Sequence, residues 1–208
     1  MDSVYHRPMD GSPDVTAFIL AGGKSTRMGT DKAFLEHQGR TLLARALDLG
    51  RSVASEVRIV GSQEKFAPFG AVVEDVFRDR GPLAGIHAAL LASATELNVM
   101  LAVDTPRIST AFLQYLIRQS RSAPDAAAVV PRAGGRWQPL CALYRPEFAT
   151  AAENALRAGR NRIDPLFGVV RTRVVEETEL QRENFSIDIF RNLNTPEEWA
   201  EQERAEGG

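Results

Sequence analysis

The sequence predicts an α/β fold in which helices cover both faces of a mainly parallel sheet. Short apolar runs alternate along the chain with segments of helical periodicity. The runs are rich in Val, Ile, Leu and Ala, as is typical of strands that are buried on both faces. The 208 residues are 44% hydrophobic and 25% charged, which suits one domain with a sizeable core. These observations indicate a Rossmann-like three-layer sandwich.

Apolar runs predict the strands of this sheet, and helical periodicity separates them. The predicted strands are residues 15–20, 57–60, 71–73, 98–103, 127–130 and 173–175. The predicted helices are residues 41–49, 82–93, 109–120 and 147–158. The first helix has an apolar stripe, and Gly50 is its expected stop. The second begins at Pro82, which favours the first turn of a helix.

The two ends of the chain differ from this pattern. Residues 1–14 are polar and contain Pro and Gly, so they are expected to form a flexible tail. The remaining residues, 15–208, are expected to form a single domain. Near the end of the chain, Thr195-Pro196-Glu197-Glu198 is a capping box with Pro at the first helical position, which predicts a last helix.

Composition excludes several classes of protein. The net charge of −2 gives no overall field that would attract nucleic acid. No apolar stretch approaches the roughly 18–20 residues of a membrane span, and the first residues lack the apolar core of a secretory signal. Cys141 is the sole cysteine, so no intrachain disulfide can form, and the three histidines are scattered. We therefore expect a cytoplasmic protein without a nucleic-acid or membrane partner.

The loop after the first predicted strand carries the clearest functional signal. Residues 20–32 read LAGGKSTRMGTDK, with three glycines, and three basic side chains against one acid. Glycine lets backbone N–H groups approach a ligand, and successive N–H groups bind anions. This pattern predicts a phosphate-binding loop. It is not a P-loop, because Phe18 stands where the first glycine of that motif belongs.

The same string resembles the L-A-G-G-x-S-x-R-M-G-x-D-K signature of nucleotidyltransferases, in particular the molybdenum cofactor guanylyltransferases. Further matches follow in the order of that family, and the resemblance covers residues 16–199. These matches are Glu74-Asp75, Gly81-Pro82-Leu83-Ala84-Gly85, Asp104-Thr105-Pro106, Gln138-Pro139-Leu140-Cys141-Ala142-Leu143-Tyr144 and Asn192-Leu193-Asn194-Thr195-Pro196-Glu197-Glu198.

The resemblance implies a fold, a reaction and partners. It implies a sandwich of the nucleotidyltransferase type, with the nucleotide in the N-terminal half and the cofactor in the C-terminal half. The implied reaction is attack by the terminal phosphate of molybdopterin on the α-phosphorus of GTP, which releases pyrophosphate. The product is the guanine dinucleotide form of the molybdenum cofactor. Transient contact with cofactor-delivering proteins or with molybdoenzymes is also implied.

Fold and motifs together predict one nucleotide crevice. Ligands of open α/β sheets bind beyond the carboxyl ends of the strands. The glycine-rich loop, Glu74-Asp75 and Asp104 each follow a predicted strand. The candidate nucleotide-binding residues are Leu20, Ala21, Gly22, Gly23, Lys32, Asp75, Gly81, Gly85 and Asp104. The resemblance gives catalytic roles to Arg27, Lys32 and Asp104.

Each of these residues also has an ordinary structural explanation. An aspartate before Thr-Pro, such as Asp104, is often a turn residue. However, a nucleoside triphosphate brings Mg²⁺, which prefers carboxylate and phosphate oxygens, and the resemblance makes Asp104 its ligand. Gly81 and Gly85 either form a plain helix start or admit an anionic ligand to the helix N-terminus. Asp75 is either a solvated acid or an acceptor for guanine N–H groups or ribose.

One position departs from the family. Related enzymes carry an asparagine after the second strand as a nucleotide contact, whereas this chain has Gly61-Ser62-Gln63. That contact is therefore missing or replaced.

The second half of the chain is expected to receive molybdopterin. Arg136 and Gln138 flank a tryptophan, and together they offer a cation, an aromatic ring and an amide. This segment either grips the pterin and its phosphate or forms a hairpin with a packed tryptophan. Asn192 and Asn194 either line the substrate site or cap the last helix.

Three alternatives remain open from the sequence. A cytidylyltransferase acting on the same cofactor tends to carry L-A-A-G in place of residues 20–23 and lacks G-P-L-x-G. A sugar-1-phosphate nucleotidyltransferase shares the glycine-rich signature but is usually longer. A nucleotide-binding sensor without turnover would be favoured by loss of Lys32 or Asp104, and both are present.

Overall fold

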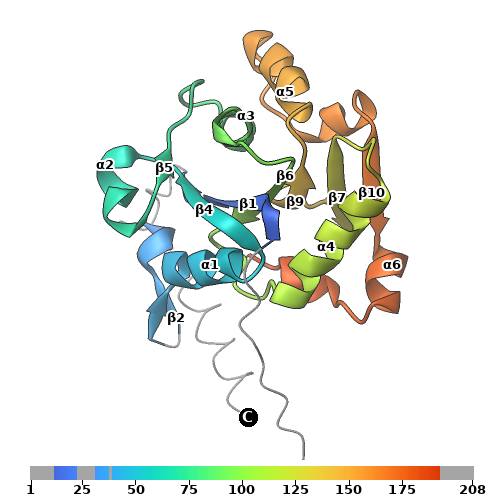
Figure 1. The fold of residues 1–208 in the computed structure, drawn as a ribbon, viewed down its shortest axis with the longest axis horizontal. Helices are drawn as coiled ribbons and strands as arrows, with labels where there is room; N and C mark the ends of the chain where they lie inside the picture. Colours follow the sequence, from blue (N-terminus) through green and yellow to red (C-terminus); the bar gives the residue numbers. More distant parts are fainter. Residues whose placement is uncertain (1–11, 23–30, 38, 193–208) are drawn as a thin grey trace, which may run out of the picture.

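The computed structural model of the protein describes residues 12–22, 31–37 and 39–192 (Figure 1). Its strands are β1 (Ser12–Leu20), β2 (Glu36–His37), β3 (Arg40–Thr41), β4 (Ala54–Val60), β5 (Val72–Val73), β6 (Leu97–Ala102), β7 (Ala128–Ala133), β8 (Arg136–Trp137), β9 (Cys141–Tyr144) and β10 (Thr172–Glu176). Its α-helices are α1 (Leu42–Arg51), α2 (Gln63–Phe66), α3 (Pro82–Ala92), α4 (Thr110–Ser122), α5 (Phe148–Arg157) and α6 (Glu177–Arg182). Short 3-10 helices are η2 (Lys32–Phe34), η3 (Ala67–Phe69), η4 (Asp164–Gly168) and η5 (Ile187–Phe190).

An eight-stranded sheet runs through the molecule in the order β10–β7–β9–β6–β1–β4–β5, and β8 pairs with β7. The pairs β1–β4, β1–β6, β4–β5 and β7–β10 are parallel. Only β9 and β8 run against their neighbours within this sheet. The predicted α/β fold with a mainly parallel sheet is thus confirmed.

Helices cover both faces of the sheet. Figure 1 shows α1 and α4 on one face and α3 and α5 on the other. The strands supply apolar side chains to both layers: Ala17 and Ile19 of β1 join the core beneath α1 and α4, whereas Phe18 joins the core beneath α3 and α5. Such strands are apolar on both faces, which is why they read as continuous apolar runs. The predicted three-layer sandwich is confirmed.

Hydroxyl caps set the start of two helices. Thr41 Oγ1 accepts a hydrogen bond from the amide of Ala44 at 3.2 Å, and Ser109 Oγ accepts from the amide of Phe112 at 3.3 Å. Each cap satisfies a backbone donor that has no partner inside the helix. The predicted helices that begin at these two residues are confirmed, with the cap residue just outside the helix.

Two predictions about boundaries are wrong. Gly50 does not stop the first helix but lies inside α1, which continues to Arg51. A Cβ at Gly50 would lie 3.2 Å from Val57 Cγ1 and 3.3 Å from Ala17 Cβ, so the glycine lets the helix pack closely on the sheet. The predicted tail is too long, because β1 already begins at Ser12. The rest of the tail and the helix predicted from Thr195 lie outside the described residues.

The described part of the chain contains no helix that is long and apolar enough to cross a membrane.

A buried histidine in α3 supports a stability prediction. His87 is 1% exposed, its ring packs edge-on against Phe77 at 5.3 Å, and neither ring nitrogen has a hydrogen-bond partner among the described residues. Burial lowers the pKa of His87 from its usual 6.5, against the opposing charge of Glu153. The unfolded chain therefore takes up this proton more readily, and stability is lost as the pH falls through 6.5.

We expect His87→Leu to raise the free energy of unfolding by about 1–3 kcal/mol, since it removes buried polar atoms without partners. The gain should be larger at about pH 5.5 than at about pH 8, because only the wild type bears the cost of protonation. Thermal unfolding of both proteins at the two pH values measures this. A gain that is absent, or that shrinks on acidification, contradicts the prediction.

Candidate active site

Four parallel strands end together at one edge of the sheet. Leu20 of β1 pairs with Val60 of β4 and with Ala102 of β6, and Val60 pairs with Val73 of β5. The residues that follow these four positions must therefore meet at a common edge. The first residues of the glycine-rich loop, Glu74-Asp75 and Asp104 therefore leave the sheet at this edge, as predicted.

Backbone hydrogen bonds tie these strand ends to one another. The amides of Ala21 and Gly22 both donate to the carbonyl of Val60 at 3.0 Å. The amide of Val103 donates to the carbonyl of Leu20 at 3.3 Å. A Cβ built on Gly22 would lie 3.5 Å from Gly61 Cα, so the exits of β1 and β4 touch. The first residues of the glycine-rich loop thus leave the sheet on a defined path.

The structure brings Lys32 and Asp104 together across 72 residues of sequence. Lys32 Nζ lies 3.3 Å from Asp104 Oδ2, and the side chains are 25% and 19% exposed. Lys32 opens η2, and Asp104 follows β6 by two residues. A cation and a carboxylate, both partly desolvated, therefore face each other at the edge where the strands end.

The turn after β6 is closed by a different residue. Thr105 Oγ1 donates a hydrogen bond to the carbonyl of Ala102 at 2.8 Å, and Thr105 is only 8% exposed. The described side-chain partner of Asp104 is Lys32. The turn is therefore stabilised by the Thr105 hydroxyl and not by the Asp104 carboxylate, which argues against a purely structural role of Asp104 in the turn.

Asp75 meets the first turn of α3. Its Oδ1 would lie 3.5 Å from a Cβ on Gly85, and Val60 Cγ1 would lie 3.2 Å from the same atom. Gly85 thus permits close contact between the helix, β4 and the carboxylate. Burial, and then the charge of Glu74, raises the pKa of Asp75 above its usual 3.8. Gly81 caps the helix with a φ of +70°, a conformation that favours glycine.

The departure at Gly61 has a steric explanation. A Cβ on Gly61 would lie 2.7 Å from Phe66 Cε2, closer than real contacts allow. The ring of Phe66 therefore occupies the space that a side chain after the second strand would need. An asparagine contact at Gly61 is excluded while Phe66 keeps this position.

Arg136 and Trp137 form β8, which folds back on β7 through Gly134 and Gly135. The Trp137 ring packs against Phe167 with centroids 4.8 Å apart, and the Arg132 guanidinium lies 5.5 Å from the Trp137 ring. The hairpin with a packed tryptophan is therefore what the structure shows. Its role in binding a substrate stays a prediction.

The hairpin nevertheless lies at the same edge of the sheet as Asp104, the edge where the parallel strands have their carboxyl ends. Strand β9 is antiparallel to both β6 and β7, so the carboxyl ends of β6 and β7 point the same way. At about 4.8 Å per strand, the two ends are roughly 10 Å apart. Arg136 is exposed, as is Asn192 after η5. The side-chain amide of Gln138 donates a long bond of 3.5 Å to the carbonyl of Arg136.

Three predicted site residues, Gly23, Arg27 and Asn194, lie outside the described residues. The structure therefore neither places them in the crevice nor removes them from it.

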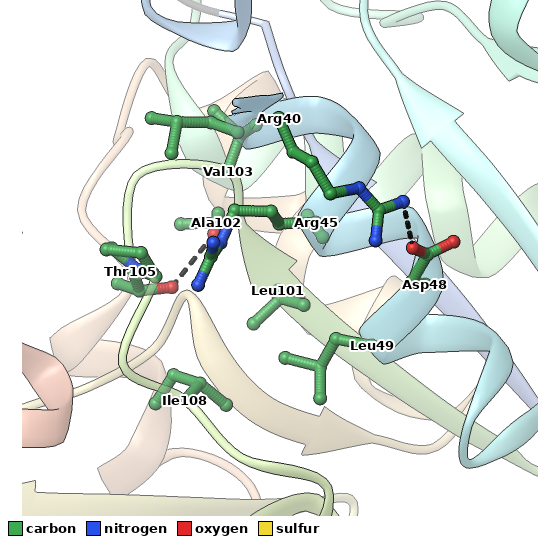
Figure 2. Close-up of a pocket in the computed structure, with 12 residues that line it drawn as sticks. Arg40, Arg45, Asp48, Leu49, Leu101, Ala102, Val103, Thr105 and Ile108 are labelled. Atoms are coloured by element: carbon green, nitrogen blue, oxygen red, sulfur yellow. Dashed lines mark hydrogen bonds and ion pairs between the residues drawn. The ribbon is translucent and has the colours of Figure 1, made fainter. Parts of the chain in front are cut away.

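A separate pocket of about 300 Å³ lies on the α1 side of β6. Figure 2 shows Arg40 directed toward Asp48, with which it forms an ion pair, and Arg45 directed toward Thr105. Lys32, Asp75 and Asp104 are not among the residues that line it. This pocket backs the turn that carries Asp104, but the predicted nucleotide residues lie elsewhere.

The donor set limits the kind of metal site. Among the described residues, no group of three or more His, Cys, Asp or Glu side chains gathers as a metal centre. Mg²⁺ at a triphosphate needs only one or two carboxylates, because phosphates and waters supply the other oxygens. Asp104 offers one such carboxylate at the strand edge.

Sequence reasoning missed Lys65 of α2. This residue forms an ion pair with Asp31, the residue before Lys32. The available signal was its position in the segment that follows β4, one of the strands that end at this edge of the sheet. A single lysine at that distance in sequence gives no hint of its partner, so only the folded chain shows the pair.

Comparisons with known proteins show which family this chain belongs to. Residues 17–171 match the family model of the MobA-like NTP transferase domain. The probable molybdenum cofactor guanylyltransferase of Pelotomaculum thermopropionicum is 38% identical over 87% of this chain and 88% of its own. The molybdenum cofactor guanylyltransferase of Syntrophotalea carbinolica is 34% identical over 91% and 90%.

A solved structure has the same fold. The molybdopterin-guanine dinucleotide biosynthesis protein A from Archaeoglobus fulgidus superposes with a TM-score of 0.79 at 24% identity, covering 92% of this chain and 98% of that one.

Proposed function

Because this chain belongs to the MobA-like NTP transferase family, we propose that it transfers GMP from GTP to the terminal phosphate of molybdopterin and releases pyrophosphate. The observation that carries the proposal is the pair of Lys32 and Asp104 at the edge where β1, β4, β5 and β6 end. Relatives named for this activity align along most of the chain. The product is the guanine dinucleotide form of the cofactor.

The reaction asks for placement and charge neutralisation more than for proton transfer. The attacking phosphate of molybdopterin is already ionised near pH 7, so no general base is required. Lys32 and Arg27 supply positive charge to the triphosphate, and the glycine-rich loop supplies backbone N–H groups. Lys32 would turn from Asp104 to the phosphates when the nucleotide binds.

Asp104 fits a magnesium ligand. Its carboxylate is 19% exposed and already has a cation, the Lys32 ammonium, at 3.3 Å. A carboxylate in such a place suits a divalent ion whose other ligands are phosphate oxygens. Mg²⁺ held there would stabilise the negative charge on the transferred phosphorus and on the departing pyrophosphate.

Asp75 is proposed to read the nucleoside. Its half-buried carboxylate beside Gly85 can accept hydrogen bonds from guanine N–H groups or from ribose. N–H or O–H groups of the nucleoside that donate to the Asp75 carboxylate compensate for its loss of hydration. A base without such donors leaves the carboxylate without a hydrogen-bond partner.

The second substrate is proposed to bind between the end of β6 and the hairpin of β7 and β8. Arg136 and Gln138 would face the pterin or its phosphate, and Asn192 and Asn194 would complete that side. The finished cofactor would pass by transient contact to a carrier protein or a molybdoenzyme.

Pyrophosphate release tests the proposed reaction against the alternatives. Release should require GTP and molybdopterin together with Mg²⁺, and should be absent with either substrate alone. A sensor would bind GTP but release no pyrophosphate under any of these conditions, which would reject the enzymatic proposal.

A competition assay tests nucleotide choice. We expect GTP to displace a labelled guanine nucleotide at a concentration at least about tenfold lower than CTP does, a difference of about 1.4 kcal/mol. The physical reason is that a base of the wrong hydrogen-bonding pattern leaves Asp75 unpaired. Equal or better competition by CTP would assign the chain to the cytidylyltransferases.

A further inference from the structure

The turn that carries Lys32 is short and depends on Asp31. Asp31 Oδ1 accepts a hydrogen bond from the amide of Ala33 at 2.9 Å, and its carbonyl accepts from the amide of Phe34 at 3.0 Å. The amide of Leu35 donates to the carbonyl of Lys32 at 3.1 Å. Because η2 has only three residues, these few bonds set the direction in which the Lys32 side chain leaves the backbone.

A second segment holds this turn from outside. Lys65, in the helix that follows β4, forms an ion pair with Asp31, whose side chain is only 17% exposed. The Lys65 ammonium also lies 5.6 Å from the Phe34 ring and 5.3 Å from the Phe66 ring. A cation in this position is attracted both by the carboxylate and by the faces of the two rings.

The aromatic rings join the same two segments. Phe34 of η2 stacks on Phe66 of α2 with centroids 5.9 Å apart, and it contacts Phe69 of η3 at 5.4 Å. Gly61 makes this possible, because the Phe66 ring fills the space of the missing side chain. The segment that takes the place of the family's asparagine therefore packs on the turn that carries Lys32.

From this geometry we propose that Lys65 is a positioning residue for the nucleotide site. It holds Asp31, Asp31 caps the turn, and the turn aims Lys32 at the triphosphate. Lys65 itself does not touch the nucleotide in this proposal. The inference rests on the proposed function for its ligand, GTP, but its structural part can be measured without one.

Lys65→Met in the full chain is the principal variant, since methionine keeps an unbranched apolar stem against the rings and removes the charge. We expect the Kd for GTP with Mg²⁺ to rise about three- to tenfold. Lys65→Arg should restore affinity to within about twofold, because it keeps the cation. Arg157→Met is the matched control: Arg157 also pairs with a carboxylate, Glu153, and lies 6.0 Å from an aromatic ring, Phe77. It should leave the Kd unchanged.

A double variant separates positioning from direct contact. If Lys65 acts through Lys32, then adding Lys65→Met to Lys32→Ala should cause little further loss of GTP affinity. Losses that simply add would mean that Lys65 binds the nucleotide itself or acts by another route, and would overturn the proposal. A wild-type Kd in Lys65→Met would overturn it as well.

Amide hydrogen exchange on the nucleotide-free protein keeps this test independent of the proposed function. Lys65→Met should speed exchange of the amides of Ala33, Phe34 and Leu35 by about three- to tenfold relative to amides of α4, and Arg157→Met should not. Unchanged exchange at these three amides would refute the positioning role whatever the ligand is. If the wild type does not bind GTP, the proposed function fails while the exchange result still decides the role of Lys65.

Discussion

Replacing Asp104 with asparagine is expected to lower turnover by at least about a hundredfold, because in its proposed role as the magnesium ligand Asp104 contributes several kcal/mol of charge stabilisation to the transition state. The residue follows β6 by two positions, and its carboxylate is 3.3 Å from the Lys32 ammonium. Asparagine keeps the size of the side chain but loses its charge. The fold should survive, since Thr105 closes the turn through its own hydrogen bond to Ala102.

The measurement is pyrophosphate release across a range of Mg²⁺ and Mn²⁺ concentrations. Partial recovery at high metal concentration would support a ligand role, because weaker binding can be offset by mass action. Asp48→Asn is the matched control: it makes the same chemical change at a partly exposed carboxylate of α1 that pairs with Arg40 and Arg51. Near-normal turnover of Asp104→Asn with unchanged Mg²⁺ dependence would reject the assignment.

Replacing Lys32 with alanine is expected to weaken GTP binding about ten- to hundredfold, since charge-assisted hydrogen bonds to phosphate contribute roughly 1.5–3 kcal/mol. The fold should be nearly unaffected. The side chains of Lys32 and Asp104 are 25% and 19% exposed, so water can still reach the Asp104 carboxylate when Lys32 is removed, and the loss of stability should stay at about 1 kcal/mol. The variant therefore separates a binding role from a structural one.

Titration of GTP with Mg²⁺ into Lys32→Ala, together with thermal unfolding, measures both effects. Arg51→Ala serves as control, because it removes another cation that pairs with a carboxylate, on α1 and away from the strand edge. Wild-type GTP affinity in a folded Lys32→Ala protein would reject the assignment of Lys32 as a triphosphate contact. An equal loss of GTP affinity in Arg51→Ala would show that net charge, and not the position of Lys32, is responsible.

The sequence by itself determined the layers of this fold. Runs such as residues 15–20 are apolar at every position except Thr16 because both faces of β1 are buried, and periodic stripes such as that of residues 41–49 mark helices with one buried face. It also predicted the edge of the sheet at which the candidate site lies, since the parallel strands β1, β4, β5 and β6 end there. The sequence thus predicted that Lys32 and Asp104 lie near the same edge of the sheet, whereas the contact between them at 3.3 Å is a finding of the structure.

Only the tertiary structure decided the strand order and the contacts between distant segments. Strand β9 inserts between β6 and β7, although a four-residue apolar run carries no sign of its partners. Gly50 was expected to end a helix, because glycine commonly does, but it lies inside α1, where the close approach of the helix to Val57 favours a residue without a side chain. The pair of Lys65 and Asp31 was equally hidden. The physical reason is that the periodicity of a sequence reflects which side chains are buried. Which distant residue a side chain contacts depends instead on the order of the strands and on where the connecting loops leave the sheet.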